Sequence, residues 1–137
     1  MNTEPSAIVR TVCRRVAVFA QIFGLYVIMH GHSSPGGGFQ GGVILASSFM
    51  LLALSEGVGE VRRRVSLGAL TALTSAGVLV YAGIGVVCLL LGANYLDYGV
   101  LAVSDPRSVG MLVIELGVGL TVAAAMLSIF LDLLNFE

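Results

Sequence analysis

The chain has 137 residues, of which 57% are hydrophobic and only 11% are charged, and its mean hydropathy is +0.98. Soluble domains carry about 25% charged residues, so this composition excludes an ordinary soluble domain and indicates a membrane protein. The net charge of −1 creates no strong field that would attract nucleic acid, and no nucleic-acid partner is expected. At this length we expect a single transmembrane domain over residues 1–137.

Four apolar segments alternate with short polar connections along the chain. A transmembrane helix needs about 20 residues, and the first two segments reach that length only when residues at the membrane interface are included. The predicted fold is therefore all-α, an integral membrane protein with four transmembrane helices and a glycine-rich turn between the first two. The expected spans are residues 12–31, 38–55, 65–92 and 109–134.

Arginine placement predicts the orientation of these spans. Arg10, Arg14 and Arg15 precede the apolar run of the first span, which begins at Val16, and residues 62–64 are three arginines between the second and the third spans. With four spans both groups fall on one side of the membrane, which leaves only Arg107 on the other. Cytoplasmic loops are enriched in Lys and Arg, so both termini are expected in the cytoplasm.

The connection between the second and third spans, residues 55–64, is expected to be a short cytoplasmic loop. Glu56 and Glu60 are expected to pair mainly with nearby arginines, because Glu60 stands four residues before Arg64, the favourable order on a helix. A purely topological role of these arginines is favoured over a role at lipid headgroups. The loop is too small to dock a soluble enzyme convincingly.

The most unusual segment runs from His30 to Gly42, because residues 35–42 contain five glycines and one proline. Unpaired backbone amides next to lipid cost several kcal/mol each. The segment therefore predicts close packing against neighbouring helices. It lacks the Lys-Ser/Thr ending and the preceding strand of a phosphate-binding loop, so nucleotide binding is not expected.

The residues that often carry chemistry are too scattered to form a metal or catalytic site. His30 and His32 stand two residues apart without further ligands nearby in sequence, whereas zinc sites gather three or four. We expect no metal, and a hydrogen bond to the backbone is the favoured role of these histidines. Cys13 and Cys88 are expected near opposite ends of their helices, too far apart for a disulfide. No catalytic residue and no cofactor is predicted.

The loop before the last span, residues 93–108, is expected on the non-cytoplasmic side. Tyr95 and Tyr98 suit the aromatic belt at the membrane interface. Asp105 precedes Pro106, so Asp105 or Ser104 is expected to cap the start of the last helix.

Small residues recur on the second and third spans, among them Gly42, Gly68, Gly77 and Gly85. Small side chains allow transmembrane helices to approach closely. Packing within a four-helix unit explains part of this pattern, and the 18 glycines of the chain are taken to indicate contacts with further subunits.

Glu115 is the main candidate for chemistry. It lies about seven residues into the last span, roughly 10 Å deep at 1.5 Å per residue. An ionisable residue at such a depth marks a proton or ion path by default. Glu115 shares a helix face with Gly119 and Ala123, so it is expected to point into a helix–helix interface. Two interpretations stay open, an ion-path residue and a structural hydrogen-bond partner.

Two segments of the sequence resemble the MnhB domain. Gly31-His32-Ser33-Ser34-Pro35-Gly36-Gly37-Gly38-Phe39-Gln40-Gly41-Gly42 is similar to the signature of that family, and Ile114-Glu115-Leu116-Gly117-Val118 is similar to its acidic element, with Glu where many members have Asp. The resemblance extends along nearly the whole chain. Proteins of the MnhB family are small membrane components of the multisubunit Mrp-type Na+/H+ antiporters.

The resemblance implies a non-enzymatic transport subunit in the cell membrane, with other antiporter subunits as partners and Na+ and H+ as the exchanged ions. It implies that Glu115 handles ions and that the motif residues shape the turn and its contact with a neighbour. These residues are His32, Pro35, Gly36, Gly37, Gly38, Phe39, Gly41 and Gly42. The alternative is the equivalent component of a membrane-bound hydrogenase-type complex that moves sodium or protons. A homo-oligomeric channel and a membrane anchor are less favoured.

Overall fold

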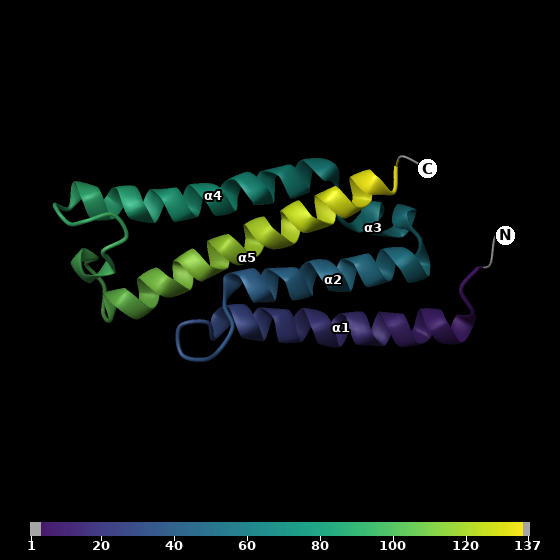
Figure 1. The fold of residues 1–137 in the computed structure, drawn as a ribbon. Coiled ribbons are helices and arrows are strands. Elements are labelled where there is room, and N and C mark those ends of the chain that lie inside the picture. The colour runs from purple at the N-terminus through teal and green to yellow at the C-terminus, as the bar shows by residue number, and fades with distance from the viewer. Residues whose placement is uncertain (1–3, 136–137) are drawn as a thin grey trace.

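The computed structural model describes residues 4–135, and in this range it contains helices and no strand. Four helices are long and apolar enough to cross a membrane. The predicted all-α, four-span fold is therefore confirmed (Figure 1). In chain order the elements are α1 (Ala7–Met29), α2 (Gly38–Glu56), α3 (Val58–Arg64), α4 (Leu67–Leu90), the short 3-10 helix η1 (Tyr98–Val100) and α5 (Pro106–Leu133).

Serine caps set two of the helix starts. The Ser6 hydroxyl accepts a hydrogen bond from Val9 N–H at 3.3 Å, and Ser66 accepts one from Ala69 N–H at 3.1 Å. Such caps satisfy N–H groups that have no partner within the helix. As a result α1 begins five residues before the expected residue 12, and the arginines at positions 10, 14 and 15 stand on the helix rather than ahead of it.

The connection expected to be a plain loop contains the two-turn helix α3, so that expectation is wrong. Gly57 ends α2 and begins α3 with a φ of +100°, a value that favours glycine. A terminal nitrogen of Arg62 on α3 donates to Leu131 O near the end of α5 at 3.4 Å. A positive charge there also complements the negative end of the helix dipole. The short helix thus ties α2 to the end of α5.

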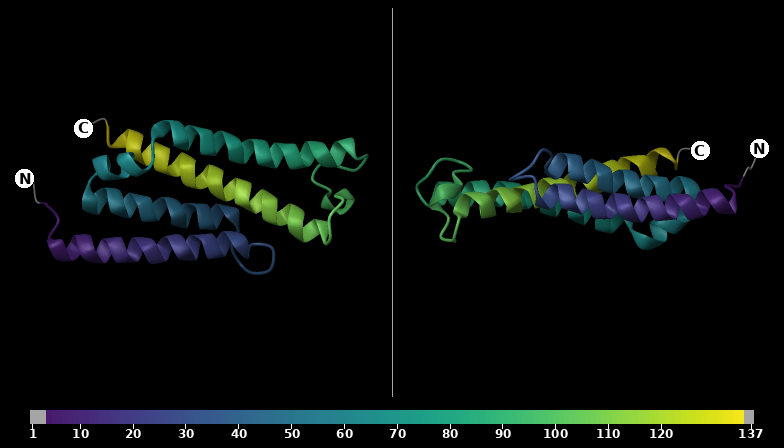
Figure 2. Two further views of the ribbon diagram at one scale, coloured as in Figure 1. Left: turned by 180° about the vertical axis from the view of Figure 1, so that it is seen from behind. Right: turned by 90° about the horizontal axis from the view of Figure 1, so that it is seen from below.

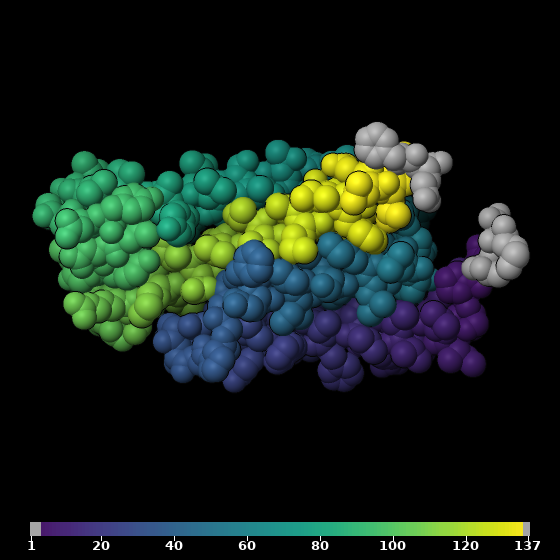
Figure 3. Space-filling model, viewed as in Figure 1, coloured from purple at the N-terminus to yellow at the C-terminus, as the bar shows by residue number. Residues whose placement is uncertain are grey.

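The four long helices lie side by side in one layer, in the order α1, α2, α5, α4 (Figures 1 and 2). The principal helix contacts agree with this order, because α2 packs on α1 and α5, and α4 packs on α5. In the space-filling view all four helices reach the same face (Figure 3). α1 exposes large apolar side chains such as Phe19 and Phe23, 71% and 56% accessible. Lipid or neighbouring helices can cover such a surface.

Glycines allow the helices of this layer to approach closely. An added methyl group would lie 2.7 Å from Gly24 O if placed on Gly41, 2.8 Å from Gly119 O if placed on Gly42, and 3.0 Å from Gly77 O if placed on Gly117. These glycines serve contacts within the chain. They confirm that packing within the four-helix unit explains part of the glycine pattern, whereas contacts of other glycines with further subunits stay a prediction.

The main hydrophobic core lies toward the end of the layer that holds α3. Its buried members come from all five α-helices, and the largest fully buried side chains among them are Leu70, Leu131 and Val61. α3 therefore closes one end of a layer that is otherwise open on both faces. Cys88 is also buried and Cys13 is half-buried, and both are free thiols.

The loop between α4 and α5 places two tyrosine rings against glycines. Tyr95 lies against Gly85 of α4, and Tyr98 lies against Gly110 of α5. Asp105 occupies the N-cap position of α5, as expected, with a left-handed φ of +51°. Its side chain makes no capping hydrogen bond, so the predicted capping interaction is wrong although the position is right.

Candidate functional site

Glu115 meets the glycine-rich segment. Its Oε2 accepts a hydrogen bond from the backbone N–H of Gly38, a residue 77 positions earlier in the chain. A methyl group added to Gly37 would lie 2.9 Å from the same oxygen, and one added to Gly31 would lie 3.5 Å from the carboxyl carbon. The half-buried carboxylate is therefore surrounded on one side by glycine backbone. We call this arrangement the Glu115 site.

Helix geometry explains why the carboxylate sits there. Gly38 is the first residue of α2, and the first N–H groups of a helix have no acceptor inside that helix. The helix dipole adds partial positive charge at the same end, which attracts an anion. Glu115 therefore supplies from α5 the acceptor that α2 lacks. Glu115 therefore lies at a helix–helix interface within the chain. Its expected place at an interface between subunits stays a prediction.

The turn between α1 and α2 is held by one carbonyl group. His30 O accepts from Ser33 N–H at 3.1 Å, from Ser34 N–H at 3.0 Å and from the Ser34 hydroxyl at 2.9 Å. Gly36 and Gly37 then take φ values of +128° and +150°, which residues with a side chain rarely adopt. These two positions let the chain reverse and present Gly38 N–H to the carboxylate.

The predicted motif divides into a packed part and an accessible part. Its buried members are Gly37, Gly38, Gly41 and Gly42. Its exposed members are His32, Pro35, Gly36 and Phe39, and the Phe39 side chain is 60% accessible. The prediction from the sequence assigned the same role to all eight residues, but only the accessible ones are available to a neighbouring subunit.

His30 is part of the turn. Its Nδ1 lies 3.0 Å from Tyr26 O, and its ring stacks on the Tyr26 ring with centroids 4.2 Å apart. The expected hydrogen bond to the backbone is confirmed for this histidine. This contact orients the residue whose carbonyl group holds the turn.

Tyr98 is a residue near the Glu115 site that sequence reasoning placed only in an aromatic belt. Burial raises the pKa of its phenol above the ordinary value of 10.0, and the charges of Tyr81, Cys88 and Glu115 add to the rise. The phenol therefore stays protonated over a wider pH range than a free tyrosine. The signal that could have revealed this position is Gly110, which leaves room for the ring on α5.

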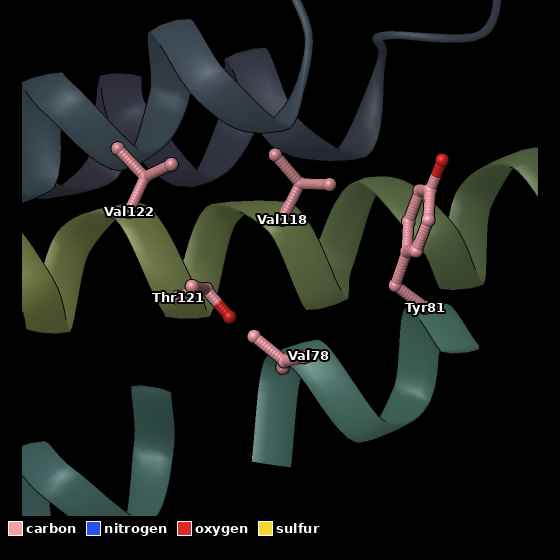
Figure 4. A pocket seen from close by; sticks show the side chains of 6 residues that line it. Val78, Tyr81, Val118, Thr121 and Val122 are labelled. Atoms are coloured by element: carbon pink, nitrogen blue, oxygen red, sulfur yellow. The ribbon is translucent and has the colours of Figure 1, made fainter. Parts of the chain in front are cut away.

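A second candidate is a hollow of about 150 Å³ between α4 and α5 (Figure 4). Val78 and Tyr81 of α4 and Val118 and Val122 of α5 are among the residues that line it. The Thr121 hydroxyl on its wall donates to Thr74 O of α4 at 3.1 Å, so it serves helix packing. A lining of this kind suits an apolar group and is a poorer candidate for ion handling than the Glu115 site.

The end of the layer opposite to the Glu115 site holds a set of charged side chains that we call the arginine cluster, namely Arg10, Arg14, Glu56, Glu60 and Arg64. Arg14 Nε donates to Glu56 Oε1 at 2.6 Å, which joins α1 to the last residue of α2. Arg64 lies 3.4 Å from the other oxygen of Glu56 and 3.2 Å from Glu60. The local Glu60–Arg64 pair is confirmed. For Glu56 the expectation of local partners is only partly confirmed, because Arg64 is a local partner but the shorter contact is to Arg14, 42 positions away.

Comparisons with known proteins agree with this architecture. A family model described as "Domain related to MnhB subunit of Na+/H+ antiporter" matches residues 8–128. A protein of Staphylococcus haemolyticus (strain JCSC1435) named "Putative antiporter subunit mnhB2" is 31% identical over 135 residues, which cover 95% of each chain. Proteins of the same name from Staphylococcus aureus strains Newman and JH1 are 45% identical over 58 residues, 42% of this chain and 41% of theirs. The chain therefore belongs to the MnhB family.

Proposed function

We propose that the chain is a small multi-pass subunit of a multisubunit Na+/H+ antiporter in the cell membrane, acting in transport rather than catalysis. Family membership and the names of the relatives support this function. The relatives give no support to a redox-driven host complex. The arginines at one end of the layer support an orientation with both termini in the cytoplasm.

Within this function, Glu115 is the proposed ion- or proton-handling residue. The observation that carries the proposal is the contact between its carboxylate and the first N–H group of α2. Between Val109 and Leu131 the sequence contains no other charged residue, so the carboxylate stands alone in an apolar stretch. An ionisable group at such a place is expensive unless it serves a function or has a partner. Within residues 4–135 the carboxylate has one hydrogen-bond partner, Gly38 N–H, and oxygen lone pairs remain for a proton or a cation.

Glu115→Gln separates the structural role from the ionic role. A glutamine retains a carbonyl oxygen that accepts from Gly38 N–H, but it carries no charge and exchanges no proton at this position. We expect a severalfold loss of Na+-dependent proton exchange in everted membrane vesicles, with a normal amount of intact complex on a native gel. Glu115→Leu removes the acceptor as well and is expected to lower the amount of complex too.

Asp132→Asn is the matched control. Asp132 lies on the same helix, is exposed, and stands near the end of α5. Removal of its charge is expected to leave exchange unchanged. Normal exchange by Glu115→Gln, with the complex intact, would show that Glu115 serves only as the acceptor for α2.

A further inference from the structure

The arginine cluster surrounds a pocket of about 320 Å³. It lies where one end of α1 meets the end of α2 and the helix α3, at the edge of the apolar part of the layer. Three arginines and two glutamates line it, so its formal charge is positive by one unit. Two features indicate what kind of ligand it accepts.

The first feature is the depth of the charges. The side chain of Glu56 is only 7% accessible, whereas those of Arg14 and Arg64 are 64% and 46% accessible. The second carboxylate of the pocket, Glu60, is 35% accessible, which is also less than either arginine. A ligand that approaches from outside therefore meets mainly guanidinium groups, although the pocket contains nearly as many acids as bases.

The second feature is the number of donors that remain. A guanidinium has five N–H groups, and Arg14 directs its Nε–H to Glu56. The Arg14 side chain is 64% accessible, so a ligand can reach the N–H groups of its terminal nitrogens. A terminal nitrogen of Arg10 binds Glu4 at 2.6 Å, and the Glu4 side chain is 82% accessible. The exposed Glu4 carboxylate thus already occupies Arg10, and water or the phosphate of a ligand can replace it there.

We propose that this pocket binds the phosphate of an anionic phospholipid headgroup. Arginine binds phosphate with two parallel hydrogen bonds, and basic groups beside a membrane-spanning helix attract anionic lipid. A lipid is favoured over free phosphate because α1 exposes apolar side chains one turn from the pocket. Val18 and Ile22 follow Arg14 on the same row of α1, one and two turns toward the centre of the span. They are 49% and 60% accessible, so they provide a surface for the acyl chains next to the site for the headgroup.

The test uses the purified full-length chain, stripped of lipid in a neutral detergent. Binding of phosphatidylglycerol and of phosphatidylcholine is measured by native mass spectrometry. We expect preferential binding of phosphatidylglycerol. Arg10→Gln should weaken it about fivefold, since one basic group at a membrane surface contributes about 1 kcal/mol. Glu4→Gln should strengthen it, because the competing carboxylate is removed.

Arg107→Gln is the matched control, since it removes one arginine at the other end of the layer and should leave binding unchanged. An equal loss in this variant would overturn the site in favour of a general charge effect. Unchanged binding by Arg10→Gln, or weaker binding by Glu4→Gln, would also overturn it. Displacement of the lipid by millimolar inorganic phosphate alone would show that the acyl chains contribute nothing and would overturn the lipid assignment. The thermal unfolding of each variant in lipid-free detergent verifies that the fold is intact.

Discussion

The two ends of the helical layer are held together by different kinds of contact. At the Glu115 site, the glycine backbone of the turn and of α2 meets α5, and one carboxylate satisfies the end of a helix. At the arginine cluster, long side chains from three helices reach one another as ion pairs. The first end is specified by shape and has no room for an added atom. The second is specified by charge, so its side chains can exchange partners with ions, water or lipid.

Gly38→Ala is expected to have the largest effect on stability, because it tests whether shape specifies the Glu115 site. The added methyl group would collide with the backbone oxygen of Glu115 and lie 3.0 Å from Gly119 N. Backbone atoms of a packed helix cannot turn away as a flexible side chain can. Overpacking of this kind costs about 1–3 kcal/mol, and we expect a lower midpoint of thermal unfolding and less intact complex.

Gly68→Ala provides the matched control for that variant. Gly68 lies in the first turn of α4, and no atom of residues 4–135 stands within 4 Å of the position that its methyl group would take. Alanine has the higher helix propensity, so the unfolding midpoint should stay the same or rise. If Gly38→Ala were as stable as Gly68→Ala, close backbone packing would not be what holds this end of the layer.

Arg14→Gln is expected to have an intermediate effect, because it tests whether charge holds the other end. It removes the hydrogen bond between α1 and the nearly buried Glu56, while Arg64 remains as a weaker partner. Hydrogen bonds to charged groups contribute about 1.5–3 kcal/mol. Because the Arg14 side chain is accessible to solvent, the contribution of this hydrogen bond is smaller. We expect the free energy of unfolding to fall by about 1 kcal/mol in detergent without anionic lipid.

A comparison with Glu60→Gln sharpens this test. Glu60 pairs with Arg63 and Arg64 near the surface, and exposed pairs on one helix contribute only about 0.3–0.5 kcal/mol. The decrease in the free energy of unfolding caused by either variant should be smaller in high salt, because salt screens accessible ion pairs most strongly. An equal loss in the two variants would contradict the view that the bridge from α1 to Glu56 is the main ionic contact.

The positions of the long helices could be predicted from the sequence, but their arrangement could not. Hydropathy identifies spans because lipid demands long apolar helices, and the caps at Ser6 and Ser66 explain why the boundaries moved by a few residues. The short helix α3 was missed because its seven residues carry no apolar run. The side-by-side order α1, α2, α5, α4 depends on which faces fit together, and hydropathy does not record that fit.

The candidate site was predicted as two separate features. Glu115 was singled out as an acid in an apolar stretch, and the glycine-rich segment was singled out as backbone in need of partners. The structure shows that each supplies what the other lacks. The two requirements are complementary, since a buried carboxylate needs donors and a helix start needs acceptors. Their meeting could not be derived from spacing along the chain, because only tertiary packing brings positions 38 and 115 together.

The smallest expected effect concerns Tyr98, which tests how tightly the loop beside the Glu115 site is packed. Burial raises the pKa of its phenol above 10.0, so the folded chain holds this proton more firmly than the unfolded chain does. The stability that this contributes is complete below pH 10 and is lost as the pH rises through the pKa of the folded state. Tyr98→Phe keeps the ring beside Gly110 but has no proton to lose. Its thermal unfolding midpoint should therefore fall less steeply above pH 10 than that of the original chain.

The matched control for this prediction is Tyr95→Phe, in the same loop between α4 and α5, where Tyr95 is 46% exposed. Midpoints measured in the same detergent between pH 8 and about 11 should separate Tyr98→Phe from both the control and the original chain. Three parallel pH profiles would contradict a half-buried, protonated Tyr98 and would mean that the loop opens before its phenol ionises. Because the loop ring rests on the helix that carries Glu115, such opening would also loosen the shape-specified end of the layer. The comparison between the two ends would then hold only below the pH at which the loop opens.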